Sequence, residues 1–405
     1  MGNLPTGPDE VPPGLAELYR DLHAHPELSF HEHRTANVIA ERLDTAWTVT
    51  RGVGGTGVVA VLRNGDGPTV WMRADMDALP VREATGLDYA STVTTADGVP
   101  VMHACGHDVH VTCLLGACQV LATHLDTWHG TVVALFQPAE EIGRGARAML
   151  DDGLLERFPR PDVVLGQHVA PGPAGMLAHC PGTMLAAADS LTIRLHGRGG
   201  HGSQPEHAVD PVVMAASLVM RLQTVVSRTV GPMEQAVVTV GRLQAGTKDN
   251  IIPAEAELGV NVRSFDEGVR ARVLAAIERL TVAEAQGAGA PRDPEIETIH
   301  NFPVTVNDVT ETERVRAAHA AALGEERVRI MGPASASEDF GLFATEAGVP
   351  SVFWMFGGDD PADFGPDGPS RPVVANHSPY FAPVIEPTIE TGVRALLIAA
   401  GAWLG

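Results

Sequence analysis

The segment TVWMRADMD, residues 69–77, begins as a largely apolar run and ends in two carboxylates. A short run of this kind is typical of a strand that is buried on both faces of a sheet. Four more such runs occur along the chain, at residues 57–62, 130–136, 163–166 and 351–356. Helical patterns, as at residues 109–124 and 143–155, separate them. This alternation predicts an α/β fold with a helix-covered, mainly parallel sheet.

The order of the predicted elements changes between residues 189 and 300. The expected order is strand, helix, two strands, helix and strand, at residues 190–196, 210–226, 235–243, 255–265, 267–286 and 295–300. This β-α-β-β-α-β order is that of a ferredoxin-like unit. We therefore predict a larger domain of residues 1–186 and 301–405, interrupted by an inserted α+β domain at residues 187–300.

The composition limits the classes of partner. The 405 residues include 50 acidic and 28 basic side chains, giving a net charge of −22 with histidine neutral. Such a surface repels nucleic acids and anionic membranes, and no apolar run reaches the roughly 18 residues of a membrane span. The N-terminal residues lack the features of a secretory signal, and four cysteines are too few for a disulfide framework. We therefore expect a cytoplasmic protein that binds neither nucleic acids nor membranes.

The densest group of reactive side chains is HACGHDVH at residues 103–110, just before the predicted helix. A thiolate and imidazoles are ligands that suit zinc, manganese, cobalt or nickel. The alternative is a polar loop in which Asp108 caps the helix. Three histidines and a cysteine in eight residues are unusual for a cap alone, so the pattern favours a metal site.

Paired carboxylates follow two of the predicted strands. Asp75 and Asp77 are two residues apart, so on an extended backbone both side chains face the same way. Glu140 and Glu141 are adjacent, so on an extended backbone they point in opposite directions, one toward a metal and one toward a substrate as a base. The alternatives are an Asp-containing turn for the first pair and a helix N-terminus for the second.

Two further histidines complete the group of candidates. His168 lies two residues beyond the predicted strand at 163–166, and by itself it would be read as an interior histidine. The acidic pairs and His168 nevertheless all follow the carboxyl ends of separate strands, which is where sites form in open α/β sheets. His377 lies in a loop before the last helix, and such loops can close over a site.

The inserted domain has its own candidates. The segment GRGGHGS, residues 197–203, presents His201 on a glycine-rich and exposed backbone. Its spacing does not match a nucleotide-binding fingerprint, and the alternative is a flexible turn. Asn250 and Arg263 are weaker candidates, for which a structural role is the alternative.

These motifs together resemble the M20 metallopeptidase family, in its amidohydrolase subfamily of hippurate hydrolases, N-acyl-amino-acid amidohydrolases and auxin-conjugate hydrolases. The matching stretches follow the family order: HAHPELSFHE (23–32), RADMDALP (73–80), MHACGHDVH (102–110), FQPAEE (136–141), GQHV (166–169), GRGGHGSQP (197–205), NIIP (250–253), SEDFG (337–341) and NHSP (376–379). They cover nearly the whole chain and are jointly specific.

The resemblance implies a site for two divalent metal ions. Carried over by position, the metal ligands are Cys105, His107, Glu141, His168 and His377. In this carry-over Cys105 bridges both ions, His107 and His168 hold one, and Glu141 and His377 hold the other. Glu140 is the general base, while Asp75 and Asp77 orient the site. In the wider family an Asp usually stands where this chain has Cys105, and a thiolate favours softer ions than a carboxylate does.

The resemblance also implies roles for the inserted domain, which becomes a lid and dimerisation domain. His201 and Asn250 match the lid residues of the family, and Arg263 matches the residue that binds the substrate carboxylate. The expected substrate is an N-acyl amino acid, and the expected assembly is a homodimer or a higher homo-oligomer.

Three other functions remain open at this point. A dipeptidase or an N-acyl-diaminopimelate deacetylase could use the same scaffold. A metal-free acyl hydrolase could use Cys105 as its nucleophile, but that hypothesis does not explain Glu140, Glu141 or His377. A binding protein without turnover would have no need of a base at Glu140.

Overall fold

The computed structural model describes residues 4–43, 45–365 and 368–405. The predicted domain bounds also include residues 1–3, 44 and 366–367, which lie outside this description. The chain divides into two compact units. The first comprises Met1–Gly182, Val306–Gly332 and Asp339–Gly405, and the second comprises Thr183–Thr305 and Pro333–Glu338. No helix in the described residues is both long and apolar enough to cross a membrane.

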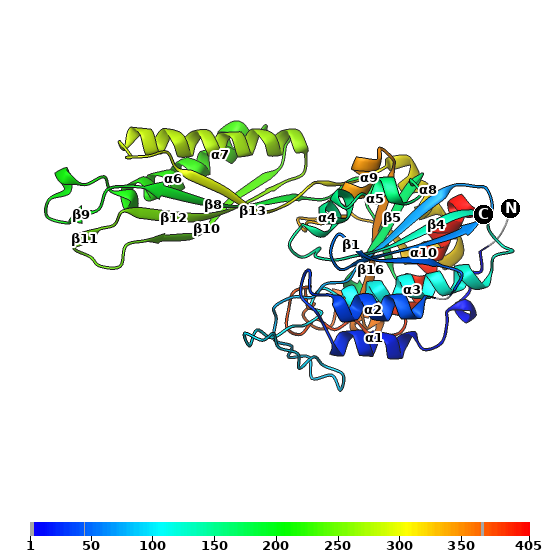
Figure 1. The fold of residues 1–405 in the computed structure, drawn as a ribbon. Helices are drawn as coiled ribbons and strands as arrows, with labels where there is room; N and C mark the ends of the chain where they lie inside the picture. The colour runs from blue at the N-terminus through cyan, green and yellow to red at the C-terminus, as the bar shows by residue number, and fades with distance from the viewer. Residues whose placement is uncertain (1–3, 44, 366–367) are drawn as a thin grey trace. The chain divides into compact units, whose positions relative to one another are not determined.

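The first unit contains an eight-stranded sheet with the order β1-β2-β4-β3-β5-β16-β6-β15 (Figure 1). Its strands are β1 (Thr48–Val53), β2 (Gly57–Asn64), β3 (Thr69–Asp75), β4 (Gly130–Gln137), β5 (Val163–Pro173), β6 (Leu177–His179), β15 (Val328–Ile330) and β16 (Ser351–Asp359). The central pairs β4–β3, β3–β5 and β5–β16 are parallel, whereas β1–β2, β2–β4 and β16–β6 are antiparallel. The predicted mainly parallel sheet is confirmed.

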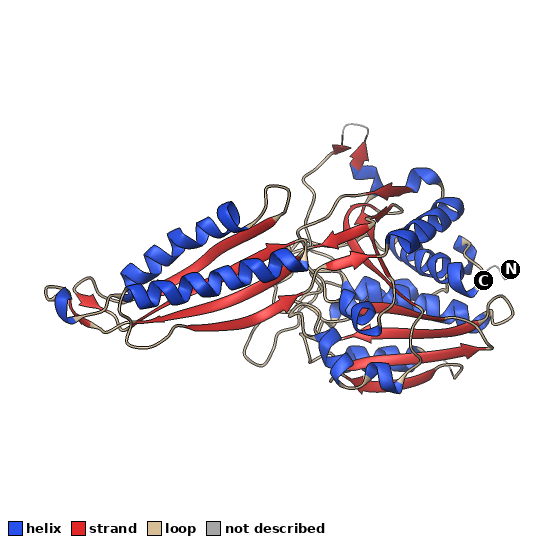
Figure 2. Ribbon diagram, turned by 90° about the horizontal axis from the view of Figure 1, so that it is seen from above, coloured by secondary structure: helices blue, strands red, loops and turns tan. Residues whose placement is uncertain are grey.

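Helices cover both faces of this sheet (Figure 2). Those of the first unit are α1 (Leu15–Ala24), α2 (His33–Arg42), α3 (His107–Thr123), α4 (Gly145–Asp151), α5 (Leu154–Arg157), α8 (Val309–Leu323), α9 (Gly341–Ala347) and α10 (Thr388–Leu404). Helices α3, α8 and α10 pack together against one face of the central strands, and α4 and α9 contact each other and the sheet. The predicted helix at 143–155 is two helices, because Gly153 adopts a φ of +82° between α4 and α5.

Strand β3 places its last residues at the edge where the candidates gather. Asp75 lies in register with Gln137 of β4, and Arg73 lies in register with Gly166 of β5. The segments that follow β3 and β4 therefore leave the sheet at the same edge, as parallel strands require. One expectation was wrong: His168 lies within β5 and not beyond it, because β5 continues to pair with β16 through this residue.

The second unit has the predicted β-α-β-β-α-β order. Its main elements are β8 (Ala187–His196), α6 (Pro211–Thr229), β10 (Ala236–Ala245), β12 (Glu255–Ser264), α7 (Glu267–Gly287) and β13 (Glu295–Phe302). The sheet order is β10-β12-β8-β13, and its neighbouring strands are antiparallel. Both helices lie on one face of this sheet (Figure 1), and each begins with an Asp whose side chain accepts a backbone N–H.

Short elements complete the description. These are the strands β7 (Gly182–Leu185), β9 (Gly200–His201), β11 (Ile251–Ile252), β14 (Thr305–Asn307), β17 (Phe364–Gly365) and β18 (Gly368–Pro369), and the 3-10 turns Pro8–Glu10, Pro205–His207, Glu325–Arg327 and Pro361–Asp363. In the second unit β9 pairs with β11, which places His201 opposite Ile251.

Candidate active site

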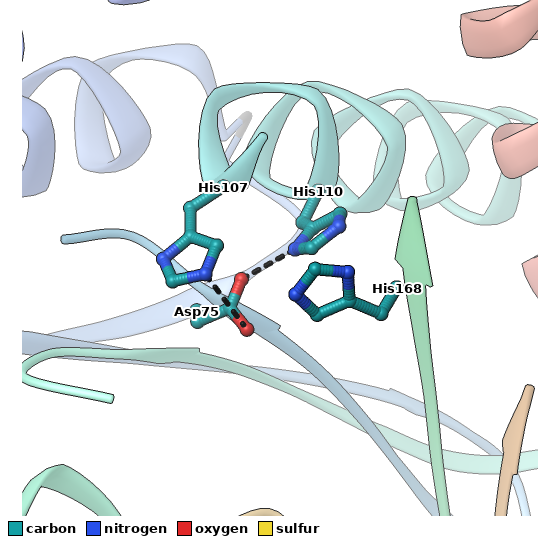
Figure 3. Close-up of side chains that lie close together, drawn as sticks. All are labelled: Asp75, His107, His110 and His168. Carbon is teal, nitrogen blue, oxygen red and sulfur yellow. Dashed lines mark hydrogen bonds and ion pairs between the residues drawn. The ribbon is translucent and has the colours of Figure 1, made fainter. Parts of the chain in front are cut away.

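The site begins at the end of β3, where Asp75 is fully buried. The guanidinium of Arg73, itself buried, donates from Nη1 to Asp75 Oδ2 at 2.6 Å. Burial acts to raise the pKa of Asp75, but the neighbouring charges of Arg73, His107 and His110 hold it well below the usual range. Asp75 is therefore a fixed negative charge beneath the cluster in Figure 3.

His110 connects Asp75 to strand β5. Its Nε2 accepts the backbone N–H of Val169 at 2.8 Å, so its Nδ1 carries the ring proton and donates it to Asp75 Oδ1 at 2.5 Å. Both ring nitrogens are thus occupied, and His110 has no lone pair left for a metal ion. Its ring packs against that of His168, with 4.4 Å between ring centroids. Figure 3 shows this group from one side. The sequence analysis counted His110 among the histidines that favour a metal site, but the family resemblance gave it no role, and its hydrogen bonds place it as a support of Asp75.

His107 differs from His110 in that neither ring nitrogen has a hydrogen-bond partner among the residues described. It is fully buried, with Nε2 3.7 Å from Asp75 Oδ2 and Nδ1 3.4 Å from Asp77 Oδ1. It is the first residue of α3, so the helix begins two residues earlier than predicted. Gly106 makes this start possible: its φ is +84°, and a Cβ there would lie 2.4 Å from Val169.

Three more predicted ligands lie together beside His107. The ligand atoms of Cys105, Glu141 and His377 lie within 4.8 Å of one another. Cys105 Sγ is also 3.4 Å from Nε2 of His168. The Nδ1 of His168 donates to the Val169 carbonyl at 2.7 Å, so Nε2 keeps its lone pair, as metal ligation requires.

The two adjacent glutamates lie in a turn, which corrects the expectation of extended backbone. The N–H of Gly143 donates to the Glu140 carbonyl at 2.7 Å, and Ala139 has a φ of +50°. Both carboxylates therefore approach His107 instead of pointing in opposite directions. Gly145 closes the turn, since a Cβ there would lie 1.6 Å from the Pro138 carbonyl oxygen.

Asp77 holds this turn through backbone hydrogen bonds. Its Oδ1 accepts the N–H of Glu140 and its Oδ2 accepts the N–H of Glu141, both at 3.1 Å. The hydroxyl of Ser29 also donates to Oδ2, at 2.6 Å. Asp77 thus fixes the backbone of the two glutamates, which agrees with the orienting role that the family resemblance implies.

The donor set fits divalent cations. Within the described part of the chain, both ring nitrogens of His107 and Oε1 of Glu141 are buried without a hydrogen-bond partner, and burying such atoms is unfavourable unless a ligand binds them. Burial raises the pKa of Glu141 to about 8 and that of Cys105 to about 12. A bound cation would offset both shifts by stabilising the ionised carboxylate and thiolate.

The other candidates belong to the second unit. His201 is exposed, and its Nδ1 accepts the N–H of Ser203 at 3.2 Å, so its ring proton is on Nε2. Asn250 lies beside it, because its carbonyl accepts the N–H of Gly202 at 2.9 Å. Arg263 donates to Ser337 Oγ at 2.6 Å, and no carboxylate pairs with it among the residues described.

Sequence reasoning also missed a fully buried carboxylate, Glu32. Its Oε1 accepts the N–H of Ala139 at 2.9 Å, so it contacts the turn at the residue before Glu140. Burial and the nearby charge of Asp77 raise the pKa of Glu32 to about 7. Its position in the family motif at 23–32 was the only signal in the sequence.

Comparisons with known proteins agree with the motifs. Residues 71–400 match the model of peptidase family M20/M25/M40. The chain is 39% identical over 333 residues to the hippurate hydrolase of Campylobacter jejuni, which covers 81% of this chain and 84% of that protein. It is 38% identical over 346 residues to an N-acetylcysteine deacetylase of Bacillus subtilis, with 84% and 87% covered.

Solved structures show the same relationship. A putative aminohydrolase from methicillin-resistant Staphylococcus aureus superposes with a TM-score of 0.83 at 34% identity, covering 96% of this chain and 94% of that one. A dinuclear metal-binding peptidase of the M20 family from Bacillus subtilis superposes with a TM-score of 0.76 at 31% identity, covering 96% of both chains. The predicted family is confirmed: this chain belongs to peptidase family M20/M25/M40 and is a hydrolytic enzyme.

Proposed function

We propose that the protein is a metal-dependent amidohydrolase that cleaves N-acyl amino acids into a carboxylic acid and a free amino acid. The observation that carries this proposal is the buried cluster of thiol, imidazole and carboxylate groups, with Glu140 as an additional acid beside the predicted ligands. The names of the relatives from Campylobacter jejuni and Bacillus subtilis, a hippurate hydrolase and an N-acetylcysteine deacetylase, support the same class of substrate.

Two divalent ions are the cofactors that this cluster suits. The residues that would hold them are Cys105, His107, Glu141, His168 and His377. When bound, such ions polarise an amide carbonyl and lower the pKa of water. The thiol of Cys105 favours zinc, cobalt or nickel over harder ions, and manganese is the fourth candidate.

Glu140 is the proposed proton carrier. Its carboxylate takes a proton from the attacking water and later donates it to the leaving nitrogen, so that the amine departs as a neutral group. Asp77 supports this role by fixing the backbone N–H groups of Glu140 and Glu141. The side chain of Glu140 is only 5% exposed, which limits competing exchange of its proton with bulk water.

The second unit is proposed as the lid, in line with the predicted inserted domain at residues 187–300. Nδ1 of His201 accepts the N–H of Ser203, so the proton on Nε2 can be donated to a tetrahedral oxyanion. Arg263, which has no carboxylate partner within the described ranges, is proposed to bind the substrate carboxylate, and Asn250 is proposed to contact the substrate beside His201. The homodimer and the cytoplasmic location stay predictions.

A thiol nucleophile is the weaker mechanism. Burial, together with the charge of Glu141, raises the pKa of the Cys105 thiol to about 12. The attacking species of a cysteine hydrolase is the thiolate, which is scarce at neutral pH when the pKa is this high. The surroundings of Cys105 therefore suit a thiol that ionises on binding a cation.

The test is a screen of purified protein. Metal-depleted protein is reloaded with zinc, manganese, cobalt or nickel, and release of free amine is measured from N-acetyl, N-benzoyl and long-chain N-acyl amino acids. Dipeptides and N-acyl-diaminopimelate are included as competing substrates. We expect hydrolysis of at least one N-acyl amino acid and its loss with a chelator. Full activity in the chelator would contradict the proposal, as would a clear preference for the competing substrates.

The metal site has a separate test in the four cysteines, all of which are buried. Elemental analysis should show that Cys105→Ser lowers the metal content to less than about half of the wild-type value, because a hydroxyl is a poor substitute for a thiolate ligand. The matched controls are Cys113→Ser, Cys118→Ser and Cys180→Ser, which should keep their metal. Equal metal content in all four variants would remove Cys105 from the site.

A further inference from the structure

Glu32 is a buried carboxylate that the proposed mechanism does not use. It ends the motif HAHPELSFHE and is fully buried. Its Oε1 accepts two backbone N–H groups, from Phe30 and from Ala139, each at 2.9 Å. Its Oε2 accepts the hydroxyl of Thr56. A carboxylate with this many partners is held in one position, and in turn it can hold the backbone that it contacts.

The two N–H groups on Glu32 belong to residues with unusual backbone angles. Phe30 has a φ of 62° and Ala139 has a φ of 50°. Residues with a Cβ rarely adopt this region, and they keep it only where surrounding contacts enforce it. Glu32 supplies such a contact to both residues at once. Ala139, with its left-handed backbone conformation, immediately precedes Glu140 in the chain.

Glu32 and Asp77 together bind three consecutive amides. Glu32 accepts the N–H of Ala139, and Asp77 accepts those of Glu140 and Glu141. The segment 27–32 contributes to both carboxylates, because Ser29 donates to Asp77. The backbone of the two glutamates is thus fixed by two buried acids, and only one of them, Asp77, is explained by the family resemblance.

We propose that Glu32 is a positioning residue that sets the orientation of Glu140 by holding the Ala139 amide. The proposal rests on the proposed function, in which Glu140 carries the proton. Glu32 acts through the backbone, and both of its oxygens accept hydrogen bonds, from Phe30 and Ala139 at Oε1 and from Thr56 at Oε2. What it must supply is an acceptor oxygen at the correct place, and a neutral amide of the same shape can also supply this oxygen.

The test compares Glu32→Ala with Glu32→Gln. In the alanine variant two buried N–H groups lose their acceptor, and the turn can relax away from its left-handed start. A misplaced catalytic group typically costs up to about 10²-fold, so we expect kcat to fall by about 10- to 100-fold, with KM within about twofold. The glutamine variant keeps an acceptor oxygen for both amides and should recover most of kcat.

A second measurement does not depend on turnover. Hydrogen exchange of the amides at residues 139–141 should accelerate in Glu32→Ala and should stay near the wild-type rate in Glu32→Gln. The metal content of both variants should equal that of the wild type, since Glu32 contacts none of the proposed ligands through a side chain. Unchanged amide exchange in Glu32→Ala would overturn the proposal, even if the wild type hydrolysed no N-acyl amino acid.

Two controls separate positioning from loss of stability. Glu27→Ala removes another carboxylate of the same motif, which binds the N–H groups of Arg34 and Thr35 and does not contact the turn. Thr56→Val removes only the partner of Glu32 Oε2. Both controls should keep kcat within about twofold. An equal loss of kcat in Glu27→Ala, or a failure of Glu32→Gln to recover activity, would show that general destabilisation explains the effect.

Discussion

Two segments that carry candidate histidines, residues 103–110 and residues 197–203, have opposite environments. In the first segment His103, His107 and His110 are all buried. Both ring nitrogens of His110 are hydrogen-bonded, whereas those of His103 and His107 have no hydrogen-bond partner within the described residues. In the second segment His201 is exposed, and its one described partner is the neighbouring Ser203. The first segment therefore holds its side chains in the protein interior with ligand atoms left for a cation, whereas the second presents an exposed donor to solvent.

Because of this difference, the two segments should contribute to catalysis in different ways. Buried side chains that are packed among other groups have low mobility. A substitution of such a side chain therefore changes the geometry or the charge of the site directly. A group that is exposed and held by one short-range contact contributes only when a substrate reaches it. Changes in the first segment and its supports should therefore affect metal content or chemistry, while changes in the second should affect turnover alone.

The largest expected effect is at Glu140. Glu140→Gln keeps the size of the side chain but cannot accept a proton, so kcat should fall by about 10²–10⁴-fold, with metal content unchanged. Its matched control is Glu141→Gln, which removes a proposed ligand and should lower the metal content measured by elemental analysis. If Glu140→Gln lost metal and Glu141→Gln kept it, the roles of the two neighbours would be reversed.

Next in size is the effect of removing the exposed donor. His201→Ala should lower kcat by about 10²–10³-fold, the usual cost of one oxyanion donor. Metal content and thermal stability should equal those of the wild type, because His201 is exposed. His207→Ala is the control, since His207 is exposed in the same segment and contacts Glu206. A normal kcat for His201→Ala would remove the second segment from the mechanism.

The exposure of His201 could be predicted from the sequence because the glycines around it, at residues 197–203, form a contiguous signal. The sequence also predicted the central strands, since β3, β4, β5 and β16 are continuous apolar runs. It did not predict where β5 ends, because that end depends on pairing with β16, whose partner residues are nearly 190 positions away in the sequence. Strand pairing of this kind has no local sequence pattern.

The supports of the buried site were the least predictable part. Glu32 and Ala139 are 107 positions apart, and His110 and Asp75 are 35 apart. A periodic pattern shows which face of an element is buried but not which polar group a buried carboxylate will meet. The expectation that Glu140 and Glu141 diverge failed for the same reason, because Asp77 and Glu32 draw the backbone into a turn.

A pH dependence of stability should distinguish the buried region from the second unit. His23 is fully buried, with Nδ1 2.7 Å from Asp108 Oδ2 and Nε2 3.1 Å from Glu83 Oε1. Burial alone would lower the pKa of His23, but these hydrogen bonds outweigh burial and raise the pKa to about 9. The raised pKa means that the stabilisation is complete below about pH 6.5 and is lost as pH rises through about 9.

The expected loss is at most about 3 kcal/mol of unfolding free energy. Denaturant unfolding followed by tryptophan fluorescence measures it in the correct region, because all five tryptophans belong to the first unit. Near pH 6.5 the His23→Gln variant should be less stable than the wild type. Between pH 6.5 and about pH 9 its free energy of unfolding should stay constant, whereas that of the wild type should fall. A wild-type curve that is flat over this interval would show that His23 is not charged in the folded protein.

The smallest effect is expected at Arg263, in the second unit. Arg263→Gln should raise KM for an N-acyl amino acid by about 10-fold with little change in kcat, because a hydrogen bond to a charged group contributes about 1.5 kcal/mol or more. Arg194→Gln is the control, since Arg194 lies on the same sheet but already pairs with Glu257 and Glu295.

The decisive comparison uses a substrate whose carboxylate is replaced by a neutral amide. The wild type should bind this substrate about 10-fold more weakly, and the Arg263→Gln variant should no longer distinguish the two. If that variant retained the full preference for the carboxylate, another cation would have to bind the substrate, and Arg263 would be a structural residue that holds Ser337.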